Sequence, residues 1–558
     1  MPTARWPEAV ALVAKPAGFV AAAMCAALLF GIAGCGQQES QDGVALKPGV
    51  QVLKRGNGAE PLTLDPHRAV SLPSLNILRD LFEGLVGTAP DGTPVPGVAE
   101  RWETTVDGLG WRFSLRADAR WSNGEPVTAG DFVAGFRRAL DPATGSASAG
   151  LLAPILNARA VMTRRMAPEE LGVEAPDDHT LVIHLAAPTP WLLDLLTHPV
   201  SSPLYRPGLE QHGEEFARAG RLVSNGPFHL ADWQPQQSIT LARNHNYWDR
   251  RNVAIDQVVY YPIEDQDVEL QRYRDGKLHW TSDVPHHQLG LVRRRLGDEL
   301  SITPRLAVTW LGLNVTRPPF EGSPELRRAL ALAIDRELIV RSVTGAGEVP
   351  AYTWVPPMAG YPSHTPTWAS LPRRRQVEEA RRLFEAAGFD AARPLELELL
   401  YPGGLNNRRL AIAVAAMWRE TLGVQTRLRE EPFAEFLVSR NDLGTTMVFR
   451  SGWAADYRDP YSFAGLFDSE TGGSDTGWRN VDYDELLQAS MQARNSRRRL
   501  ALLAEAEQLL LDEQPIIPLY FDVRRRLVKP EVRGWEPNPM DLHPSRHFYI
   551  AAAQAGPQ

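Results

Sequence analysis

A regular alternation of apolar and polar residues predicts strands in the first half of the chain. Apolar side chains at every second position are typical of a strand with one buried face, and Trp111, Phe113 and Leu115 follow this pattern. Ser122, Asn123 and Gly124 then supply a turn. The strands predicted in this way cover 111–115, 179–185, 238–243 and 257–263.

Other stretches place apolar residues at helical spacing. Thr128 and Asp131 have the spacing of a capping box, which predicts a helix that begins at this point and runs through Leu140. A second helix is predicted from Pro324 to about Val343. The chain contains no internal sequence repeat of the kind that builds a solenoid, so this class of fold is excluded.

The most orderly segment of the chain covers 395–457. Its predicted elements are a strand over 395–400, a helix over 408–422, a strand over 424–429, a short helix over 433–439 and a strand over 445–449. This order predicts parallel strands with right-handed crossovers. Because ligands of open parallel sheets bind beyond the carboxyl ends of the strands, we expect a binding loop over 450–457. The alternative is a solvated loop whose charges pair with each other.

Length and composition describe a large soluble protein. The chain has 558 residues, of which 44% are hydrophobic and 23% charged, which excludes a disordered or collagen-like chain. Such a length accommodates roughly three or four domain-sized units. The net charge of −8 makes nucleic acid and anionic membranes poor electrostatic partners.

The amino-terminal segment predicts export. Residues 16–34 carry no charge, follow Lys15 and end directly before Cys35. This sequence is typical of a bacterial lipoprotein signal, in which Cys35 is lipidated and becomes the new amino terminus. A single-pass membrane anchor is the alternative. After cleavage Cys35 is the only cysteine left, so we expect no internal disulfide.

The signatures of common enzymes and metal sites are missing. The chain has no phosphate-binding loop, no zinc-protease motif, no nucleophile elbow and no serine–lysine motif. His286 and His287 are adjacent, and neighbours on a strand point to opposite faces. We therefore expect no catalytic activity, no cofactor and no metal.

A series of short motifs extends along nearly the whole chain in a fixed order. They are Leu64–His67, Arg79–Leu85, Pro96–Trp102, Trp121–Thr128, Asn225–Pro227, Asn246–Asp249, Pro350–Tyr352, Gly452–Tyr457 and Leu527–Pro530. With these motifs in this order, the chain resembles the family 5 extracellular solute-binding proteins, the peptide-binding components of bacterial ABC importers.

The resemblance implies an α/β, two-lobed hinged fold of the periplasmic-binding-protein type, with an additional domain and mixed sheets flanked by helices. After the signal segment 1–34, it implies a tether and first part of domain I over 35–82, domain II over 83–205 and domain III over 307–523. The remaining parts of domain I are then 206–306 and 524–558. The ligand is expected between domains I and III.

The resemblance also implies roles for individual residues. Asp456 matches the acidic residue that holds the α-ammonium of a peptide, a charge that is tolerated in a closed site only when paired. The backbone of Gly452 and Ala454 is expected to pair with the peptide as an added strand. The other matched positions are Trp453 and Phe433 at side-chain pockets, Arg440 and Arg450 near the cleft and Leu72 at a backbone-pairing position of domain I. Arg450 is expected to meet a peptide carboxylate directly or through water.

Several positions depart from the family pattern. Asn407 and Thr344 stand where a histidine and a lysine meet peptide carboxylates, so the carboxylate end of the site has been rebuilt. Val70 replaces an acidic residue and Ser148 replaces a tyrosine. Both members of a bridging cysteine pair are absent, and Ala307 and Ala454 stand in their places.

The first functional hypothesis is a lipid-anchored monomeric peptide receptor that works with an ABC permease and its ATPase subunits. The second keeps the fold but assigns another solute, such as a modified or cell-wall peptide, haem or a nickel chelate. A secreted enzyme is the third. Asp456 argues against ligands without an amine, and the missing signatures argue against the enzyme.

Overall fold

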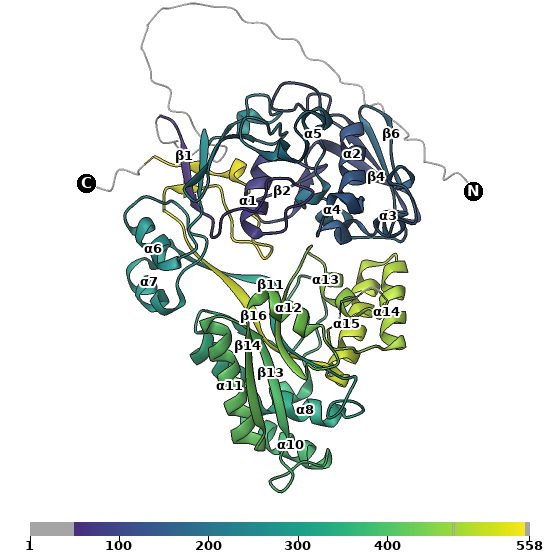
Figure 1. Cartoon of the computed structure of the whole chain (residues 1–558), viewed down its shortest axis with the longest axis vertical. Helices are drawn as coiled ribbons and strands as arrows, with labels where there is room; N and C mark the ends of the chain where they lie inside the picture. Colours follow the sequence, from purple (N-terminus) through teal and green to yellow (C-terminus); the bar gives the residue numbers. More distant parts are fainter. Residues whose placement is uncertain (1–48, 471, 474, 553–558) are drawn as a thin grey trace, which may run out of the picture.

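The computed structural model describes residues 49–470, 472–473 and 475–552. The predicted signal segment and Cys35 lie outside these residues. Within them the chain forms two lobes, one above the other in Figure 1, joined by the long strands β11 (Leu300–Leu313) and β16 (Ile516–Leu527). This is the two-lobed α/β fold that the resemblance implies. No helix of the described part is long and apolar enough to cross a membrane.

The upper lobe contains two four-stranded sheets among its described residues. The first has the order β1 (Val52–Gly56), β10 (Gln257–Tyr261), β9 (Ser238–Arg243) and β8 (Phe228–Gln234), with β1 and β10 parallel. The second is antiparallel and has the order β4 (Ala99–Thr104), β5 (Gly110–Leu115), β7 (Thr180–His184) and β6 (Val173–Asp177). The four strands predicted in this half of the chain are confirmed. The second sheet falls within 83–205, the segment expected as domain II.

The predicted helix over 128–140 is confirmed as α2 (Ala129–Leu140). The backbone N–H of Thr128 donates to the Asp131 carboxylate at 2.9 Å, as a capping box requires. The other α-helices of this part of the chain are α1 (Leu72–Leu81), α3 (Ala158–Met162), α4 (Leu192–Leu195), α5 (Arg206–His212), α6 (Gln266–Arg274) and α7 (Leu289–Arg295). Short strand pairs complete it: β2 (Val86–Thr88) with β3 (Pro94–Pro96), and β17 (Val532–Arg533) with β18 (Tyr549–Ile550).

The lower lobe is built on a six-stranded mixed sheet among the described residues. Its order is β12 (Val349–Pro350), β16, β11, β15 (Val448–Ala454), β13 (Glu396–Pro402) and β14 (Gln425–Glu431). Helices flank this sheet in Figure 1. The α-helices described in this part of the chain are α8 (Pro324–Ala333), α9 (Arg336–Leu338), α10 (Arg373–Ala386), α11 (Leu405–Leu422), α12 (Phe433–Arg440), α13 (Tyr461–Ala464), α14 (Val481–Gln492) and α15 (Ser496–Glu513).

The predicted parallel unit is confirmed, with one correction. β13 lies between β14 and β15 and runs parallel to both. We expected a loop from Arg450 onward, but β15 continues as a strand through Ala454. The reason is β11, which pairs with β15 along its whole length. The predicted strand ended too early because it rests on the neighbouring parallel strands alone. Its antiparallel partner, β11, lies far away in the sequence.

The predicted helix over 324–343 is wrong in its middle. α8 ends at Ala333, and Ile334 is extended, with ψ at 124°. The Asp335 carboxylate accepts a hydrogen bond from the backbone N–H of Leu338 at 2.8 Å and starts a new helical segment. This segment, α9, passes into a π-helical turn over 339–344. The apolar residues therefore keep their helical spacing although the helix itself is interrupted, and the Asp335 cap starts a new helical segment.

The expected domain boundaries at 306/307 and 523/524 fall within the two strands that join the lobes. The pairing of β11 with β16 shifts register between Pro304 and Val308, so β11 carries extra residues at this point. Such a bulge bends a strand locally. We therefore propose the segment around Arg305 as the hinge.

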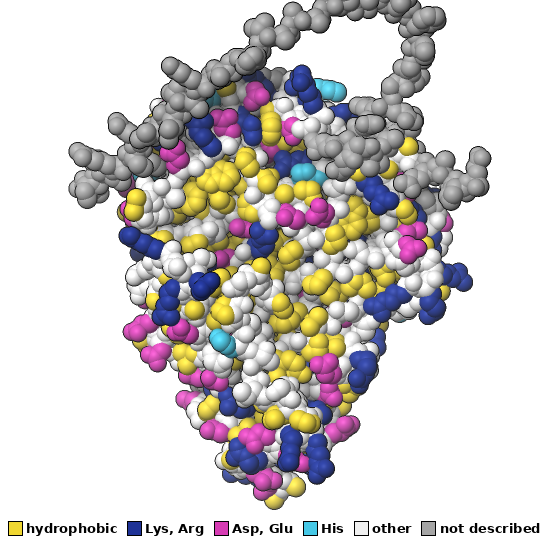
Figure 2. Space-filling model, turned by 180° about the vertical axis from the view of Figure 1, so that it is seen from behind, with side chains coloured by type: hydrophobic (Ala, Val, Ile, Leu, Met, Phe, Trp, Pro, Cys, Tyr) yellow, Lys and Arg dark blue, Asp and Glu magenta, His cyan; other side chains and the backbone are white. Residues whose placement is uncertain are grey.

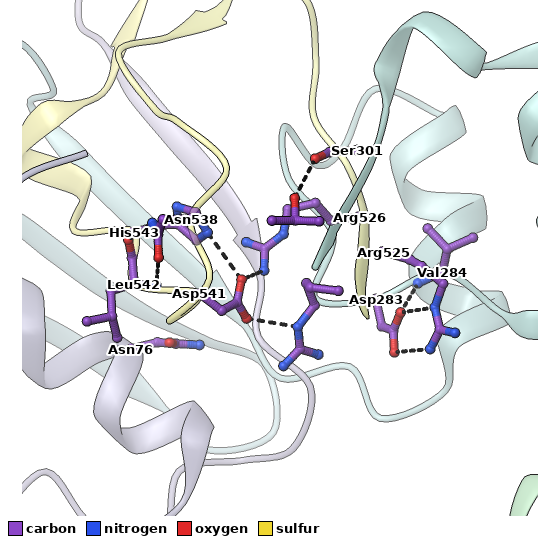
Figure 3. A network of polar contacts seen from close by, with 12 residues as sticks. Asn76, Asp283, Val284, Ser301, Arg525, Arg526, Asn538, Asp541, Leu542 and His543 are labelled. Carbon is purple, nitrogen blue, oxygen red and sulfur yellow. Dashed lines mark hydrogen bonds and ion pairs between the residues drawn. The ribbon is translucent and has the colours of Figure 1, made fainter. Parts of the chain in front are cut away.

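A buried ion-pair network lies beside this hinge (Figure 3). Asp541 accepts hydrogen bonds from Arg526 and, at 2.8 Å, from Nε of Arg524, while a ring nitrogen of His543 lies 3.1 Å away. Burial alone raises the pKa of a carboxyl, yet the Arg526 charge and the His543 contact hold the pKa of Asp541 well below its usual range. The charges in this network are therefore satisfied by protein groups.

The molecular surface in Figure 2 mixes both signs of charge. Basic and acidic side chains are interspersed on this face and gather together at its lower tip, while apolar side chains spread over its middle. A surface of this kind agrees with the modest net charge of −8.

Candidate ligand-binding site

A cavity of about 590 Å³ is lined by side chains of both lobes. The upper lobe contributes Val70, Ser148 and Trp191, among others, and the lower lobe contributes Asp456 and Tyr457. Val70 and Ser148 are two of the positions that depart from the family pattern, so both departures change the wall of one cavity. A space between two lobes that carries a carboxylate is suited to a small charged ligand.

Asp456 is the carboxylate of this cavity. It lies two residues after the end of β15, and its backbone N–H donates to Oγ of Ser462 at 3.0 Å, which fixes the loop. Its side chain reaches solvent in the cavity, but the surrounding protein removes enough water to raise its pKa to about 6. Among the described residues, no cation or hydrogen-bond donor contacts the carboxylate. Asp456 is therefore a carboxylate without a protein counter-ion in the described structure.

The strand before Asp456 has one free edge. β11 pairs with β15 from Val448 to Ala454, whereas β13 reaches β15 only at Val448 and Phe449 in the described structure. The N–H of Ala455 donates to the carbonyl of Leu306 at 2.8 Å. Because hydrogen-bonded positions alternate in an antiparallel pair, the N–H and C=O groups of Ala454, Gly452 and Arg450 point to the opposite edge.

Gly452 and Ala454 are both exposed, which keeps this edge accessible. A Cβ atom added at Gly452 would meet only Val308 and Thr309, at 3.7 and 4.0 Å. No close contact therefore requires a glycine at this position, and the missing side chain leaves open space beside the strand. Ala454 lies directly opposite Ala307 on β11. The two positions are therefore neighbours, as expected if they stand in place of a bridged cysteine pair.

Two other predicted residues are held by their own lobe. Nε1 of Trp453 donates to the carbonyl of Ser462 at 2.8 Å, and its indole packs partly buried against the lower core. Arg440 forms an ion pair with Asp475 at 2.7 Å and donates to Oγ of Ser451 at 3.1 Å. Arg440 thus connects the end of α12 to β15.

The remaining predicted residues lie away from the large cavity. Phe433 is 64% exposed at the start of α12. Asn407 lies in the first turn of α11, where its side chain donates to the carbonyl of Gly403 at 3.0 Å. Leu72 begins α1 and lines a second cavity of about 210 Å³ together with Arg524. Of the nine predicted ligand residues, Asp456 alone lines the 590 Å³ cavity in the described structure.

Sequence reasoning missed an aromatic contact between the lobes. Trp191 of the upper lobe stacks on Tyr457 and Tyr461 of the lower lobe, with ring centroids 5.4 and 4.6 Å apart. Arg458 also lies 4.0 Å from Asp194. Burial raises the pKa of Asp194 to about 6, against the opposing effect of Arg458. Tyr457 belongs to a motif that the sequence singled out, but nothing near Trp191 signals its partner.

A polar contact across three strands of the lower sheet was missed as well. Arg450 on β15 donates to Oγ1 of Thr309 at 3.4 Å, and Thr309 in turn lies 3.3 Å from a carboxylate oxygen of Asp522 on β16. Arg450 was predicted near the cleft, but its acidic neighbour was not, because the two are brought together only through β11. No group of three metal-ligating side chains occurs among the described residues.

Taken together, these features define a two-lobed protein with a cavity between its lobes that is lined by the Asp456 carboxylate. Residues 93–475 match the model of the bacterial extracellular solute-binding proteins, family 5 Middle, and the chain belongs to this family.

Relatives and solved structures agree with this assignment. The chain is 37% identical over 505 residues to the periplasmic oligopeptide-binding protein OppA of Escherichia coli K12, covering 90% of this chain and 92% of that protein. The murein tripeptide binding protein MppA of Escherichia coli superposes with a TM-score of 0.80 at 34% identity, over 91% of this chain and 100% of that one. Haemophilus influenzae OppA in complex with the peptide RPPGFSPFR gives a TM-score of 0.78 at 34% identity, with the same coverage.

Proposed function

We propose that this protein is the substrate-binding component of an ABC importer and captures peptides between its two lobes. The observation that carries this proposal is the unpaired carboxylate of Asp456 beside the free edge of β15. The family is one of solute-binding proteins, and two similar proteins are named for binding oligopeptides and a murein tripeptide.

Asp456 is proposed to hold the α-ammonium group of the peptide. An ammonium that leaves water must be paired, and a charge-assisted hydrogen bond to a carboxylate is among the stronger polar contacts in proteins. The raised pKa of Asp456, about 6, reflects the cost of leaving this carboxylate unpaired in the cavity. A bound ammonium removes that cost.

The free edge of β15 is proposed to hold the peptide backbone. The outward N–H and C=O groups of Gly452 and Ala454 can pair with an extended chain as an additional strand. Such pairing contacts main-chain atoms only and therefore accepts many sequences. Leu72 is proposed to pair with the peptide from the upper lobe, Trp453 and Phe433 to line side-chain pockets, and Asn407 to stand at the rebuilt carboxylate end.

Arg450 is the cation proposed for a peptide carboxylate. Arg440, the other arginine of the prediction, already pairs with Asp475 at 2.7 Å. Arg450 contacts Thr309 at 3.4 Å and also interacts with Tyr520, but among the described residues it forms no ion pair. It therefore retains most of its hydrogen-bonding capacity for a ligand.

Export and anchoring complete the proposal. We propose that residues 1–34 direct export, that Cys35 is lipidated and tethers the protein to a membrane, and that a monomer delivers peptides to the permease and ATPase subunits from the periplasmic or outer face of the cell envelope.

Native mass spectrometry of protein purified without denaturation tests the proposed ligand class. A ladder of copurified peptide masses is the expected result. A single mass of a modified or cell-wall peptide would favour the second candidate, which the similarity to a murein tripeptide binding protein supports. Loss of mass from an added peptide would contradict both and indicate an enzyme.

A further inference from the structure

The large cavity between the lobes is lined by a second charged side chain besides Asp456. Arg159 lies on α3 of the upper lobe and lines the same cavity of about 590 Å³. In Figure 1, α3 lies at the edge of the upper lobe that faces α13 and α14 of the lower lobe. Tyr461 on α13 and Met491 on α14 line the cavity as well. The negative and the positive charge of the cavity wall therefore come from opposite lobes.

Arg159 has no protein partner in the part of the chain that the structure describes. Its side chain is exposed, and no ion pair or hydrogen bond from these residues reaches its guanidinium group. It forms no ion pair with Asp456 either, although both line one cavity. Burial, followed by the Asp468 charge, raises the pKa of Tyr461 to about 12, and the Arg159 charge opposes this rise. The Arg159 charge is therefore felt at the cavity wall and is free to meet a ligand.

The rest of the described cavity wall is uncharged. His198 lines it too, but burial, assisted by the Arg79 charge, lowers the pKa of His198 to about 3 and keeps the ring neutral. Val70 stands where the resemblance implies an acidic residue, so Asp456 is the one acidic side chain among the described lining residues. Trp191 adds aromatic surface. A cavity of this size accommodates much more than an ammonium group.

We propose that Arg159 is a specificity-determining residue that binds an anionic side chain on the first residue of the peptide, so that the protein prefers peptides beginning with aspartate or glutamate. This inference rests on the proposed function, in which Asp456 holds the α-ammonium group. The side chain nearest to that ammonium belongs to the first residue, and it is the one placed to enter this cavity. An acidic first residue carries the ammonium that pairs with Asp456 and the carboxylate that pairs with Arg159.

Because the two charges lie on different lobes, a residue that pairs with both favours the closed arrangement through its differential affinity. A guanidinium–carboxylate pair is a charge-assisted contact, but Arg159 is exposed, and exposed pairs contribute little. We therefore expect a gain of about fivefold in affinity. Asp456 repels a nearby carboxylate, so an acidic first residue should be favoured only while Arg159 is present.

Isothermal titration with matched tripeptides tests this assignment. The probes are Glu-Ala-Ala and Gln-Ala-Ala, which differ in charge and hardly in size, together with Ala-Glu-Ala and Ala-Gln-Ala, which move the same difference to the second position. At the first position we expect glutamate to bind about fivefold more tightly than glutamine. At the second position the two affinities should agree within about twofold.

Two variants assign the preference to Arg159. Arg159→Gln is expected to lower the affinity ratio of Glu-Ala-Ala to Gln-Ala-Ala to about one or below, because Asp456 then repels the carboxylate without compensation. Arg159→Glu is expected to favour Lys-Ala-Ala over Gln-Ala-Ala by about fivefold. A merely structural role of Arg159 would not produce this exchange of preferences.

Two other exposed arginines serve as controls. Arg165→Gln removes the same charge close by in the sequence, at a position that does not line the cavity. Arg374→Gln removes it on α10, where the side chain is 89% exposed. Both variants should keep the wild-type ratio. Since Arg159 itself is exposed, its variants should fold, and thermal unfolding checks this.

Equal affinity of the wild-type protein for Glu-Ala-Ala and Gln-Ala-Ala would overturn the inference while leaving the proposed function intact. So would a preference that persists in Arg159→Gln, that is lost equally in Arg165→Gln, or that occurs at the second position alone. Failure of every tripeptide to bind the wild-type protein would overturn the proposed function, and this inference with it.

Discussion

Two polar regions of the lower lobe differ in how their charged side chains are held. At one, Asp456 is a single carboxylate without a protein partner, on a loop that its own backbone contact with Ser462 holds at 3.0 Å. At the other, Arg450, Thr309 and Asp522 share contacts of 3.3 to 3.4 Å across three strands. The first region depends on one residue and the second on a balance of charges, so single substitutions should abolish binding at the first and retune it at the second.

Replacing Asp456 with Asn should produce the largest effect. The substitution keeps the size of the side chain but leaves the peptide ammonium without a counter-ion. Loss of one partner from a buried charge pair costs on the order of 3–5 kcal/mol, or roughly a hundredfold to several-thousandfold in affinity. Titration of a free-amine peptide measures it, with Arg374→Gln as the matched surface control. A loss below about fivefold would remove the distinction between the two regions.

Gly452→Val should weaken the affinity for all peptides by about tenfold, which is in the range of the free-energy cost of steric overpacking. The new side chain occupies space that the ligand backbone needs, whereas the protein itself tolerates a Cβ, with nearest atoms at 3.7 and 4.0 Å. Thermal unfolding should therefore change little. Unchanged affinity in a folded variant would show that the free edge of β15 is not the peptide-binding edge.

Lowering the pH should weaken binding through Asp456. Its pKa is raised to about 6 in the free protein, and an ammonium binds the charged carboxylate, so affinity should be intact near pH 7.5 and fall as the pH drops through 6. At pH 5 the expected loss is about tenfold. In Asp456→Asn this part of the pH dependence should disappear. An identical pH profile in both proteins would assign the titration to another group, such as Asp522 or Asp194.

Arg458→Gln should have the smallest effect. Arg458 lies 4.0 Å from Asp194 across the cleft, and both side chains are partly exposed, so the pair contributes little and closure should lose only about twofold in affinity. The stacking of Trp191 on Tyr457 and Tyr461 remains. A loss larger than that of Gly452→Val would show that this charge pair, and not the peptide-binding edge, dominates closure.

The sequence predicted the two regions unequally, for physical reasons. Asp456 follows a recognisable strand in a motif, and the capping box of Thr128 and Asp131 is a local signal, so both could be read from neighbouring residues. Arg450 and Asp522 are far apart in the chain, and both contact Thr309 only because β11 lies between β15 and β16. No spacing rule indicates such a meeting. The helix break at Asp335 was not predicted because the apolar residues keep their helical spacing on both sides of the side-chain cap.

The binding partner of Asp456 can be measured most directly with peptides whose amino terminus is acetylated. Acetylation removes the ammonium, so the wild-type protein should bind these peptides roughly a hundredfold or more weakly. In Asp456→Asn the same acetylation should cost little, because the partner is already gone. Titration of free and acetylated peptides against both proteins completes the cycle. A strong coupling between the two changes is the predicted result, and losses that simply add would show that Asp456 does not touch the ammonium.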